Sequence, residues 1–397
     1  DAAKIEEVVG DFVNLKRRGA NYSGLCPFHN EKSPSFNVNP ARNIFKCFGC
    51  GKAGDPITFV MEHEQLSYPE AVKYLARKYR IELEETESSD QQRQEQQAID
   101  SLYLVNQFAQ EFFQTQLFDT DKGRSIGLSY FKQRGFREET LKKFGLGFAQ
   151  NDMDALLRAG KLRGYNAELL KKLGLVTQYE RDFFRDRVMF PIVNQKGEVI
   201  AFGGRVLGQG EPKYLNSPET PLFEKGREVF GLPQARAVIR ETGTAIVVEG
   251  YMDVVALAQH GVGNTVATLG TATTPTHVYK LLRQAERLVF CFDGDGAGRK
   301  AAWRALENSL ETLPEQKSIG FAFLPDGEDP DSFVRQRGAE AFRRLIVEAM
   351  PLSDFLLREL AGHCDLSSAE GRARLVAVAK PLIGRLQSPL LRLQVVK

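Results

Sequence analysis

Four potential metal ligands stand in two close pairs near the N-terminus. Cys26 and His29 form the first pair and Cys47 and Cys50 the second, with two residues between the members of each pair. A two-residue gap lets one tight turn direct both side chains at one ion, and three thiolates with one imidazole suit structural Zn²⁺. The alternative is a set of unrelated thiols beside a surface histidine. The spacing favours a zinc ribbon, which could contact nucleic acid, contact protein or only hold a small fold together.

A second group of candidates consists of acids that follow apolar runs in the last third of the chain. They are Glu249, Asp293, Asp295, Asp329 and Asp331. Ligands of open α/β sheets bind at the carboxyl edge of the strands. Carboxylates that converge there repel one another unless cations neutralise them, and oxygen ligands select Mg²⁺ or Mn²⁺. The alternative is that such acids are helix N-caps and turn residues, and for Asp253 and Asp326 taken singly we expect that alternative.

The elements that would position these acids can be read from four apolar runs that alternate with helical patterns. The runs are 244–248, 265–269, 288–292 and 319–323. Near-continuous apolar strands alternating with helices indicate a parallel sheet covered on both faces. His277 lies in a helical context without partner cysteines, and we expect its role to be structural.

The composition indicates a soluble protein of two or three domains. No apolar run is long enough to cross a bilayer, and there is no secretory segment. The ribbon thiols must stay reduced to bind metal, which favours the cytoplasm. The net charge of the 397 residues is only +2, so affinity for a polyanion must come from local patches. Because the chain starts without Met, we expect a fragment of something longer.

Several motifs together resemble those of the bacterial DnaG-type primases. Residues 249–253 (Glu-Gly-Tyr-Met-Asp) and 293–298 (Asp-Gly-Asp-Gly-Ala-Gly) are similar to the Toprim motif pair that these primases share with type IA and II topoisomerases. The cysteine and histidine pairs of 26–50 resemble the zinc-binding domain of the primases, and 202–226 resembles their basic region. The resemblance covers essentially the whole chain in the same order.

The resemblance implies a DNA primase, a DNA-directed RNA polymerase that makes short RNA primers on single-stranded DNA. It implies structural Zn²⁺ and catalytic Mg²⁺ or Mn²⁺, with Glu249, Asp293 and Asp295 forming the catalytic acid cluster and Asp329 and Asp331 helping to hold metal. The implied partners are single-stranded DNA template, ribonucleoside triphosphates and the replicative helicase, with a single-stranded-DNA-binding protein as a further candidate and no membrane. The implied location is the cytoplasm, at the replication fork.

Basic and aromatic residues of the middle region match family positions that line a groove for template and nucleotide. They are Arg134, Arg205, Lys213, Tyr214 and Lys225. Tyr214 could stack on a base while Lys213 meets a phosphate. The alternative is that these are ordinary solvated charges. The stretch 185–192, which begins Arg-Asp-Arg, is also similar to the family.

The predicted fold class is a multidomain α/β and α+β protein. We expect a zinc-ribbon DNA-binding domain at 1–84, a flexible linker at 85–100 that could also begin a solvated helix, a basic subdomain at 101–240, a Toprim catalytic subdomain at 241–337 and a helical subdomain at 338–397. The family also carries a C-terminal helicase-binding domain, and we expect no segment here to correspond to it.

Two other classes of function stay open at this point. The first is another Toprim enzyme, a topoisomerase or a nuclease. A topoisomerase would need a nucleophilic tyrosine in a separate domain, and no segment resembles one. The second is a non-catalytic zinc-ribbon DNA-binding module, against which the intact acid set argues.

Overall fold

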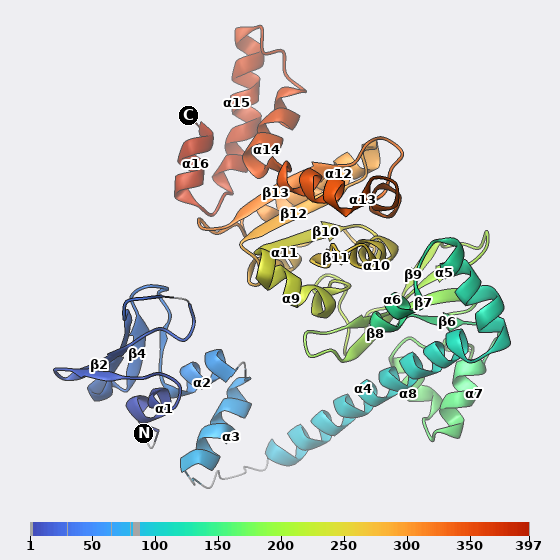
Figure 1. The fold of residues 1–397 in the computed structure, drawn as a ribbon, viewed down its shortest axis with the longest axis horizontal. Coiled ribbons are helices and arrows are strands. Elements are labelled where there is room, and N and C mark those ends of the chain that lie inside the picture. Colours follow the sequence, from blue (N-terminus) through green and yellow to red (C-terminus); the bar gives the residue numbers. More distant parts are fainter. Residues whose placement is uncertain (1–2, 30, 65, 80, 82–87, 397) are drawn as a thin grey trace. The chain divides into compact units, whose positions relative to one another are not determined.

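The chain divides into two compact units, residues 1–94 and residues 95–397 (Figure 1). The computed structural model describes residues 3–29, 31–64, 66–79, 81 and 88–396. Within this described part of the chain, no helix is long and apolar enough to cross a membrane. Each unit has hydrophobic cores of its own.

In the described residues of unit 1, an antiparallel sheet of five strands, in the order β1-β2-β3-β4-β5, is accompanied by helices. Its elements are α1 (Ile5–Gly10), β1 (Lys16–Arg18), β2 (Asn21–Gly24), β3 (Phe36–Asn39), β4 (Ile44–Cys47), β5 (Ala53–Gly54), α2 (Pro56–Glu64) and α3 (Tyr68–Tyr79). Alternate residues of β3 and β4 face inward, so the rings of Phe36 and Phe45 stack with centroids 5.2 Å apart. Phe59 of α2 packs edge-on against Phe45. This aromatic core holds the sheet against the helices.

The prediction of a flexible linker at 85–100 is wrong for residues 88–100, because these residues form the beginning of the helix α4 (Ser88–Phe118). Residues 85–87 lie outside the described residues. The first turns of α4 are rich in Gln, Glu and Arg, which have good helix propensity. The helix also continues into a buried stretch from Leu102 onward, and tertiary packing is what stabilises most helices. The second alternative, the start of a solvated helix, is the one observed for residues 93–100, which are exposed.

After α4, unit 2 forms an antiparallel sheet in the order β6-β7-β8-β9, flanked by short helices. Its strands are β6 (Gly147–Ala149), β7 (Arg187–Val193), β8 (Val199–Val206) and β9 (Tyr214–Asn216), and its helices are α5 (Ser129–Gln133), α6 (Glu138–Lys143), α7 (Ala155–Leu162) and α8 (Ala167–Lys172), with a wide helical turn at Gly123–Leu128. The register pairs Arg205 of β8 with Tyr214 of β9. These two predicted site residues therefore lie side by side.

The second sheet of unit 2 confirms the predicted parallel arrangement. Its order is β11-β10-β12-β13-β14, with an antiparallel edge strand that the sequence did not predict. The elements are α9 (Leu232–Thr242), β10 (Thr244–Val248), α10 (Tyr251–Gln259), β11 (Thr265–Ala267), α11 (Pro275–Leu282), β12 (Arg287–Phe292), α12 (Gly296–Ser309), β13 (Ser318–Phe323), α13 (Pro330–Val347) and β14 (Met350–Pro351). Alternate residues of β10 enter two different cores, Ile246 one and Val247 the other. Both faces are therefore covered.

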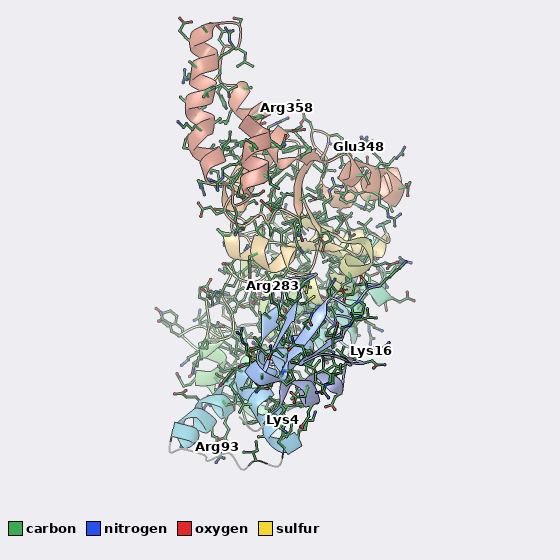
Figure 2. All side chains as sticks on the ribbon, turned by 90° about the vertical axis from the view of Figure 1, so that its left-hand side faces the viewer. Lys4, Lys16, Arg93, Arg283, Glu348 and Arg358 are labelled. Atoms are coloured by element: carbon green, nitrogen blue, oxygen red, sulfur yellow. The ribbon has the colours of Figure 1, made fainter. Side chains whose placement is uncertain are left out.

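Three helices follow the sheet, as the apolar pattern after residue 338 predicted (Figure 1). They are α14 (Leu352–Ala361), α15 (Ala369–Gly384) and α16 (Pro389–Val396). Phe355 of α14 stacks on Phe321 of β13 with centroids 4.6 Å apart, which joins the helices to the sheet. Figure 2 shows Arg358 on α14 and Glu348 at the end of α13 in this part of the unit.

Candidate functional site

The four predicted zinc ligands meet in unit 1. Their ligand atoms all lie within 4.8 Å of one another. The sulfurs of Cys26 and Cys50 are 3.8 Å apart, and the sulfur of Cys47 is 3.9 Å from Nδ1 of His29. Sulfurs about 2.3 Å from a tetrahedral ion lie about 3.8 Å apart, so the group fits Zn²⁺.

Neighbouring groups orient these ligands. The sulfur of Cys47 accepts hydrogen bonds from two backbone amides of the turn that follows it. Burial raises the pKa of Cys47, but Ser35 and these amides outweigh burial and lower it to about 7. Nε2 of His29 lies 3.2 Å from the Glu31 carboxylate, a contact that fixes the ring of a metal-bound histidine. Sequence reasoning missed Glu31, because a lone acid in a turn has no spacing signal.

Among the phenylalanines of the ribbon, Phe48 is the one that is mostly exposed, at 69%. Phe36 and Phe45 are in the core. Nζ of Lys46 lies 5.3 Å from the centroid of the Phe48 ring. The register places Lys46 in one row across the sheet with Lys16, which Figure 2 labels. This outer surface therefore combines an aromatic ring with cations.

The five predicted acids lie at the carboxyl edge of the parallel sheet. Glu249 follows β10, Asp293 and Asp295 follow β12, and the other two begin α13. The N-cap alternative describes the contacts of Asp295, which accepts a hydrogen bond of 2.7 Å from the Gly298 amide. Asp329 caps α13 in the same way, through the Ser332 amide. Asp295 and Asp329 therefore cap helices and also lie at the carboxyl edge of the sheet, so the two alternatives do not exclude each other.

The charges at this edge act on one another. Burial, then Asp293 and Asp295, raise the pKa of Glu249. Burial, then Asp329 and Asp295, raise the pKa of Asp293. Among the described residues, these acids do not gather their oxygens as closely as the four zinc ligands do. Burial and then mutual repulsion raise the pKa values of Glu249 and Asp293, and such oxygen donors nevertheless fit a divalent cation, which would relieve the repulsion.

Asp253, for which the sequence favoured a structural role, lies among the same acids. Its Oδ1 accepts a hydrogen bond of 3.3 Å from the Asp331 amide, which ties α10 to the start of α13. Burial, followed by the charge of Asp329, raises the pKa of Asp253 to about 8. The Asp253 carboxyl group therefore makes a structural contact and also lies with the five predicted acids. We call these acids the acid edge: Asp253, Glu249, Asp293, Asp295, Asp329 and Asp331.

Two of the predicted nucleic-acid-binding residues, Arg134 and Arg205, lie against one ring that was not predicted as part of the site, and Arg205 also contacts the predicted Tyr214. The guanidinium carbons of Arg134 and Arg205 each lie 5.2 Å from the ring centroid of Tyr130, and that of Arg205 lies 5.7 Å from the centroid of Tyr214. The available sequence signal was the spacing of Tyr130 and Arg134, which puts them on one helical face. We call Tyr130, Arg134, Arg205 and Tyr214 the basic ladder.

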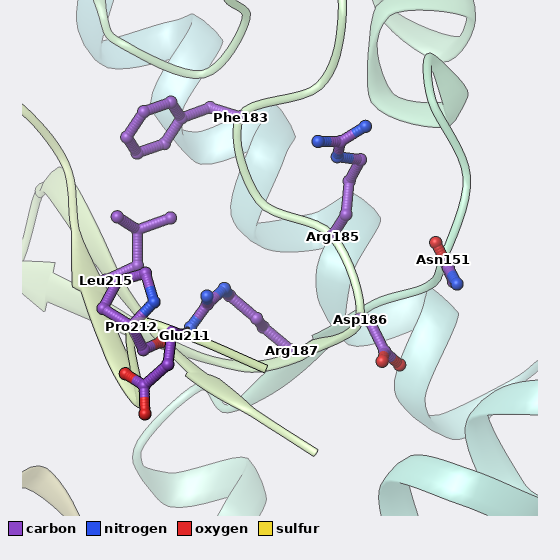
Figure 3. Close-up of a pocket in the computed structure, with 8 residues that line it drawn as sticks. All are labelled: Asn151, Phe183, Arg185, Asp186, Arg187, Glu211, Pro212 and Leu215. Carbon is purple, nitrogen blue, oxygen red and sulfur yellow. Dashed lines mark hydrogen bonds between the residues drawn. The ribbon is translucent and has the colours of Figure 1, made fainter. Parts of the chain in front are cut away.

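Lys213 is exposed and directly precedes β9, in a loop whose backbone is hydrogen-bonded by Arg187. Arg187 donates hydrogen bonds to the carbonyl oxygens of Gly204 and Pro212, at 3.2 and 2.9 Å. Figure 3 shows Arg187 beside Pro212 and Glu211. The pocket there has a volume of about 480 Å³ and is lined by Asn151, Phe183, Arg185, Asp186, Arg187, Glu211, Pro212 and Leu215. Arg187 is thus a support for the loop of Lys213.

Lys225, the remaining predicted cation, is fixed by hydrogen bonds of its backbone amide and carbonyl groups. Its amide donates to Glu219, and its carbonyl oxygen lies 3.0 Å from Nε2 of His277. Nδ1 of His277 accepts a hydrogen bond from the Thr274 amide. This pattern needs a neutral imidazole with its proton on Nε2, and burial lowers the pKa of His277. The expected structural role of His277 agrees with these contacts.

Acid should therefore destabilise unit 2 through His277. A lowered histidine pKa means that the unfolded chain binds more protons below about pH 6.5, so this contribution to stability is present above that pH and is lost as the pH falls. We expect His277→Gln to cost about 1–2 kcal/mol at pH 7.5, where two hydrogen bonds are lost, and less at pH 5.5, because the unfolded wild-type chain there binds a proton that the buried imidazole excludes.

Calorimetric unfolding at the two pH values measures this difference. His363→Gln is the matched control, because His363 is exposed, and its cost should not change with pH. An equal cost of His277→Gln at both pH values would contradict the prediction.

Three consecutive segments of the chain match known protein families. Residues 1–91 match a family described as CHC2 zinc finger, 112–236 the N-terminal domain of the DNA primase catalytic core, and 246–334 a Toprim-like family. The fold and the sites therefore define a zinc-finger protein with a Toprim core. The matches follow the order of the predicted domains, whose boundaries stay predictions.

Individual relatives and solved structures specify the class of protein more closely. The chain is 47% identical to a DNA primase of Pseudomonas aeruginosa, with 98% of this chain and 60% of the relative covered, and 44% identical to one of Neisseria meningitidis, with 98% and 66% covered. A structure of the DnaG primase catalytic domain bound to ssDNA matches with a TM-score of 0.71 at 44% identity, covering 75% of this chain and 94% of that one. A structure of the zinc-binding and RNA polymerase domains of the Aquifex aeolicus primase matches with a TM-score of 0.64 at 33% identity, covering 99% and 93%.

The chain belongs to the bacterial DNA primase family of the DnaG type. It spans about three fifths of the length of the Pseudomonas relative.

One expectation is corrected by a further match. Residues 353–397 match a family described as the DnaB-helicase binding domain of primase, so the prediction that no segment corresponds to such a domain is wrong. The reason is that an amphipathic pattern shows which helix face is buried but not which partner the exposed face binds. These helices were therefore interpreted only as packing behind the sheet.

Proposed function

We propose that this chain acts as a DNA primase and joins ribonucleotides into short primers on single-stranded DNA. The observation that carries the proposal is that the acid edge and the basic ladder act on each other. Burial raises the pKa of Asp331, and Arg134 is among the cations that oppose this. Burial raises the pKa of Tyr214, and Asp253 adds to the increase. A template backbone held by the ladder would therefore lie next to the acids.

The acid edge would hold Mg²⁺ or Mn²⁺ through Glu249, Asp293 and Asp295, with Asp329 and Asp331 as additional ligands. Such ions activate an attacking oxygen and shield the charge of a leaving pyrophosphate. The contribution of the chain itself is position and charge, which dominate phosphoryl transfer. No histidine or lysine base is needed at this site.

The basic side chains would bind the backbone of the template and the incoming nucleotide. Arg134, Arg205, Lys213 and Lys225 meet phosphates in this proposal, and Tyr214 stacks on a base. The position of Lys213 in an exposed loop supported by Arg187 favours such a contact. The similar DnaG primase catalytic domain was solved bound to ssDNA, which supports the same substrate class for this chain.

Unit 1 would read the template at the start of synthesis. Its Cys26, His29, Cys47 and Cys50 group would hold Zn²⁺, and the exposed Phe48 with Lys46 offers a ring and a cation for one base and one phosphate. Residues 353–397 would contact the replicative helicase, as the matched family's description indicates. Ribonucleoside triphosphates and a single-stranded-DNA-binding protein complete the proposed partners, at replication forks in the cytoplasm.

A primer-synthesis assay tests the function. The chain is given single-stranded DNA, ribonucleotides and Mg²⁺ or Mn²⁺, and products are resolved by length. Short RNA that depends on template, on metal and on ribonucleotides is expected. Relaxation of supercoiled DNA or cleavage of the template without RNA would indicate another Toprim activity, and absence of RNA with either metal would overturn the proposal.

A further inference from the structure

Tyr130 brings two like charges to one aromatic ring. Arg134 lies one helical turn after Tyr130, whereas Arg205 comes from β8, yet both guanidinium carbons are 5.2 Å from the ring centroid. Tyr214 contacts the Arg205 guanidinium as well. Tyrosine rings attract cations through the negative face of the ring, so this arrangement offsets part of the repulsion between the two arginines.

Neither arginine has a close ion-pair partner in the described part of the chain, although the charge of Asp331 acts on Arg134 from beyond ion-pairing distance. None of the ion pairs found there joins Arg134 or Arg205 to a carboxylate. Arg205 is only 9% exposed, and its buried Nε has no hydrogen-bond partner. A buried cation without a close ion-pair partner is costly, and such a group indicates that an anion completes the site.

The hydroxyl group of Tyr130 contributes little to this arrangement. It is buried and has no hydrogen-bond partner among the described residues. The contact with the two arginines is made by the ring. A phenylalanine at this position would therefore keep the contact and remove an unsatisfied polar atom.

We propose that Tyr130 is a positioning residue that holds Arg134 and Arg205 together so that both meet phosphates of one single-stranded DNA. This inference rests on the proposed function, because it takes template as the anion. A free arginine side chain samples many rotamers, and fixing two of them in advance reduces what the ligand must order when it binds. Tyr130 acts through the arginines and touches no ligand itself.

Template binding by the whole chain tests the role of the ring. Tyr130→Leu should weaken binding to a labelled single-stranded DNA about tenfold and lower the slope of log affinity against log salt by about 1.4, which corresponds to two phosphate contacts on a single strand. Tyr130→Phe should bind with an affinity and a slope close to those of the wild type. Tyr279→Leu is the control, because it removes a similar ring from Arg283 on the exposed side of α11.

A double-mutant comparison shows whether Tyr130 acts through the arginines. When Arg134→Ala and Arg205→Ala are already present, Tyr130→Leu should cause no further loss of binding. An additive loss, or a loss in Tyr130→Phe as large as in Tyr130→Leu, would overturn the inference. Tyr130→Leu that binds like the wild type would also overturn it.

The failure of this inference differs from the failure of the proposed function. Primer synthesis by the wild type together with unchanged DNA binding in Tyr130→Leu would refute only the role of Tyr130. Salt-dependent DNA binding that needs the ring, without any RNA product, would refute only the primase activity. A wild-type chain that binds no single-stranded DNA would refute both.

Discussion

Replacing Asp293 and Asp295 together by asparagine should reduce primer synthesis by roughly two to three orders of magnitude, the scale of losing a preorganised electrostatic group. The variant should still fold. Burial and neighbouring acids raise the pKa of Asp293, so its charge is unfavourable in the free protein. Asn at 295 also keeps an N-cap for α12, since asparagine caps helices as well as aspartate does. We therefore expect an unchanged or higher unfolding temperature with almost no product.

The matched control is Asp326→Asn in the loop between β13 and α13. Asp326 is exposed and near the same edge, so a general loss of negative charge would affect both variants. Product should be measured at several Mg²⁺ and Mn²⁺ concentrations alongside thermal unfolding. Wild-type yields from the double variant would rule out the site assignment. A yield from Asp326→Asn as low as that of the double variant would show that the acids act only through their summed charge.

The features that the sequence predicted are those set by local spacing. Cys26, His29, Cys47 and Cys50 meet because a two-residue gap forces each pair into one turn, and β3 and β4 pair the two halves. Glu249 and Asp293 lie at one edge because the parallel strands β10 and β12 both end there. In both cases a short pattern fixes a geometry that the rest of the fold cannot easily change.

Contacts that join distant segments could not be predicted. Tyr130 contacts Arg205, which lies 75 residues further along and is placed there by the pairing of β7 with β8. The tie between Asp253 and Asp331 spans 78 residues in the same way. The polar stretch 88–100 was interpreted as a linker because composition alone does not show that a buried segment continues the helix. Side-chain partners across such separations depend on the whole packing arrangement.

Replacing Cys47 by serine should reduce initiation on single-stranded DNA about tenfold or more, while extension of a supplied primer falls by less than about twofold, because unit 1 would read template only at the start. Cys47 is fully buried at the end of β4, and its sulfur lies 3.2 Å from Oγ of Ser35 and accepts a hydrogen bond from the turn that follows. Serine is a poor zinc ligand, and a unit of fewer than 100 residues depends strongly on its metal for folding. Zinc content should therefore fall together with initiation.

Cys364→Ser provides the comparison, because Cys364 is a partly exposed thiol outside the four ligands. It should keep bound zinc, measured by metal analysis, and should keep both initiation and extension. Equal losses of initiation and extension in Cys47→Ser would mean that the metal only holds a fold together. Zinc loss that leaves initiation intact would separate the ribbon from template reading altogether. A selective loss of initiation would instead assign to the metal site the choice of where a primer begins.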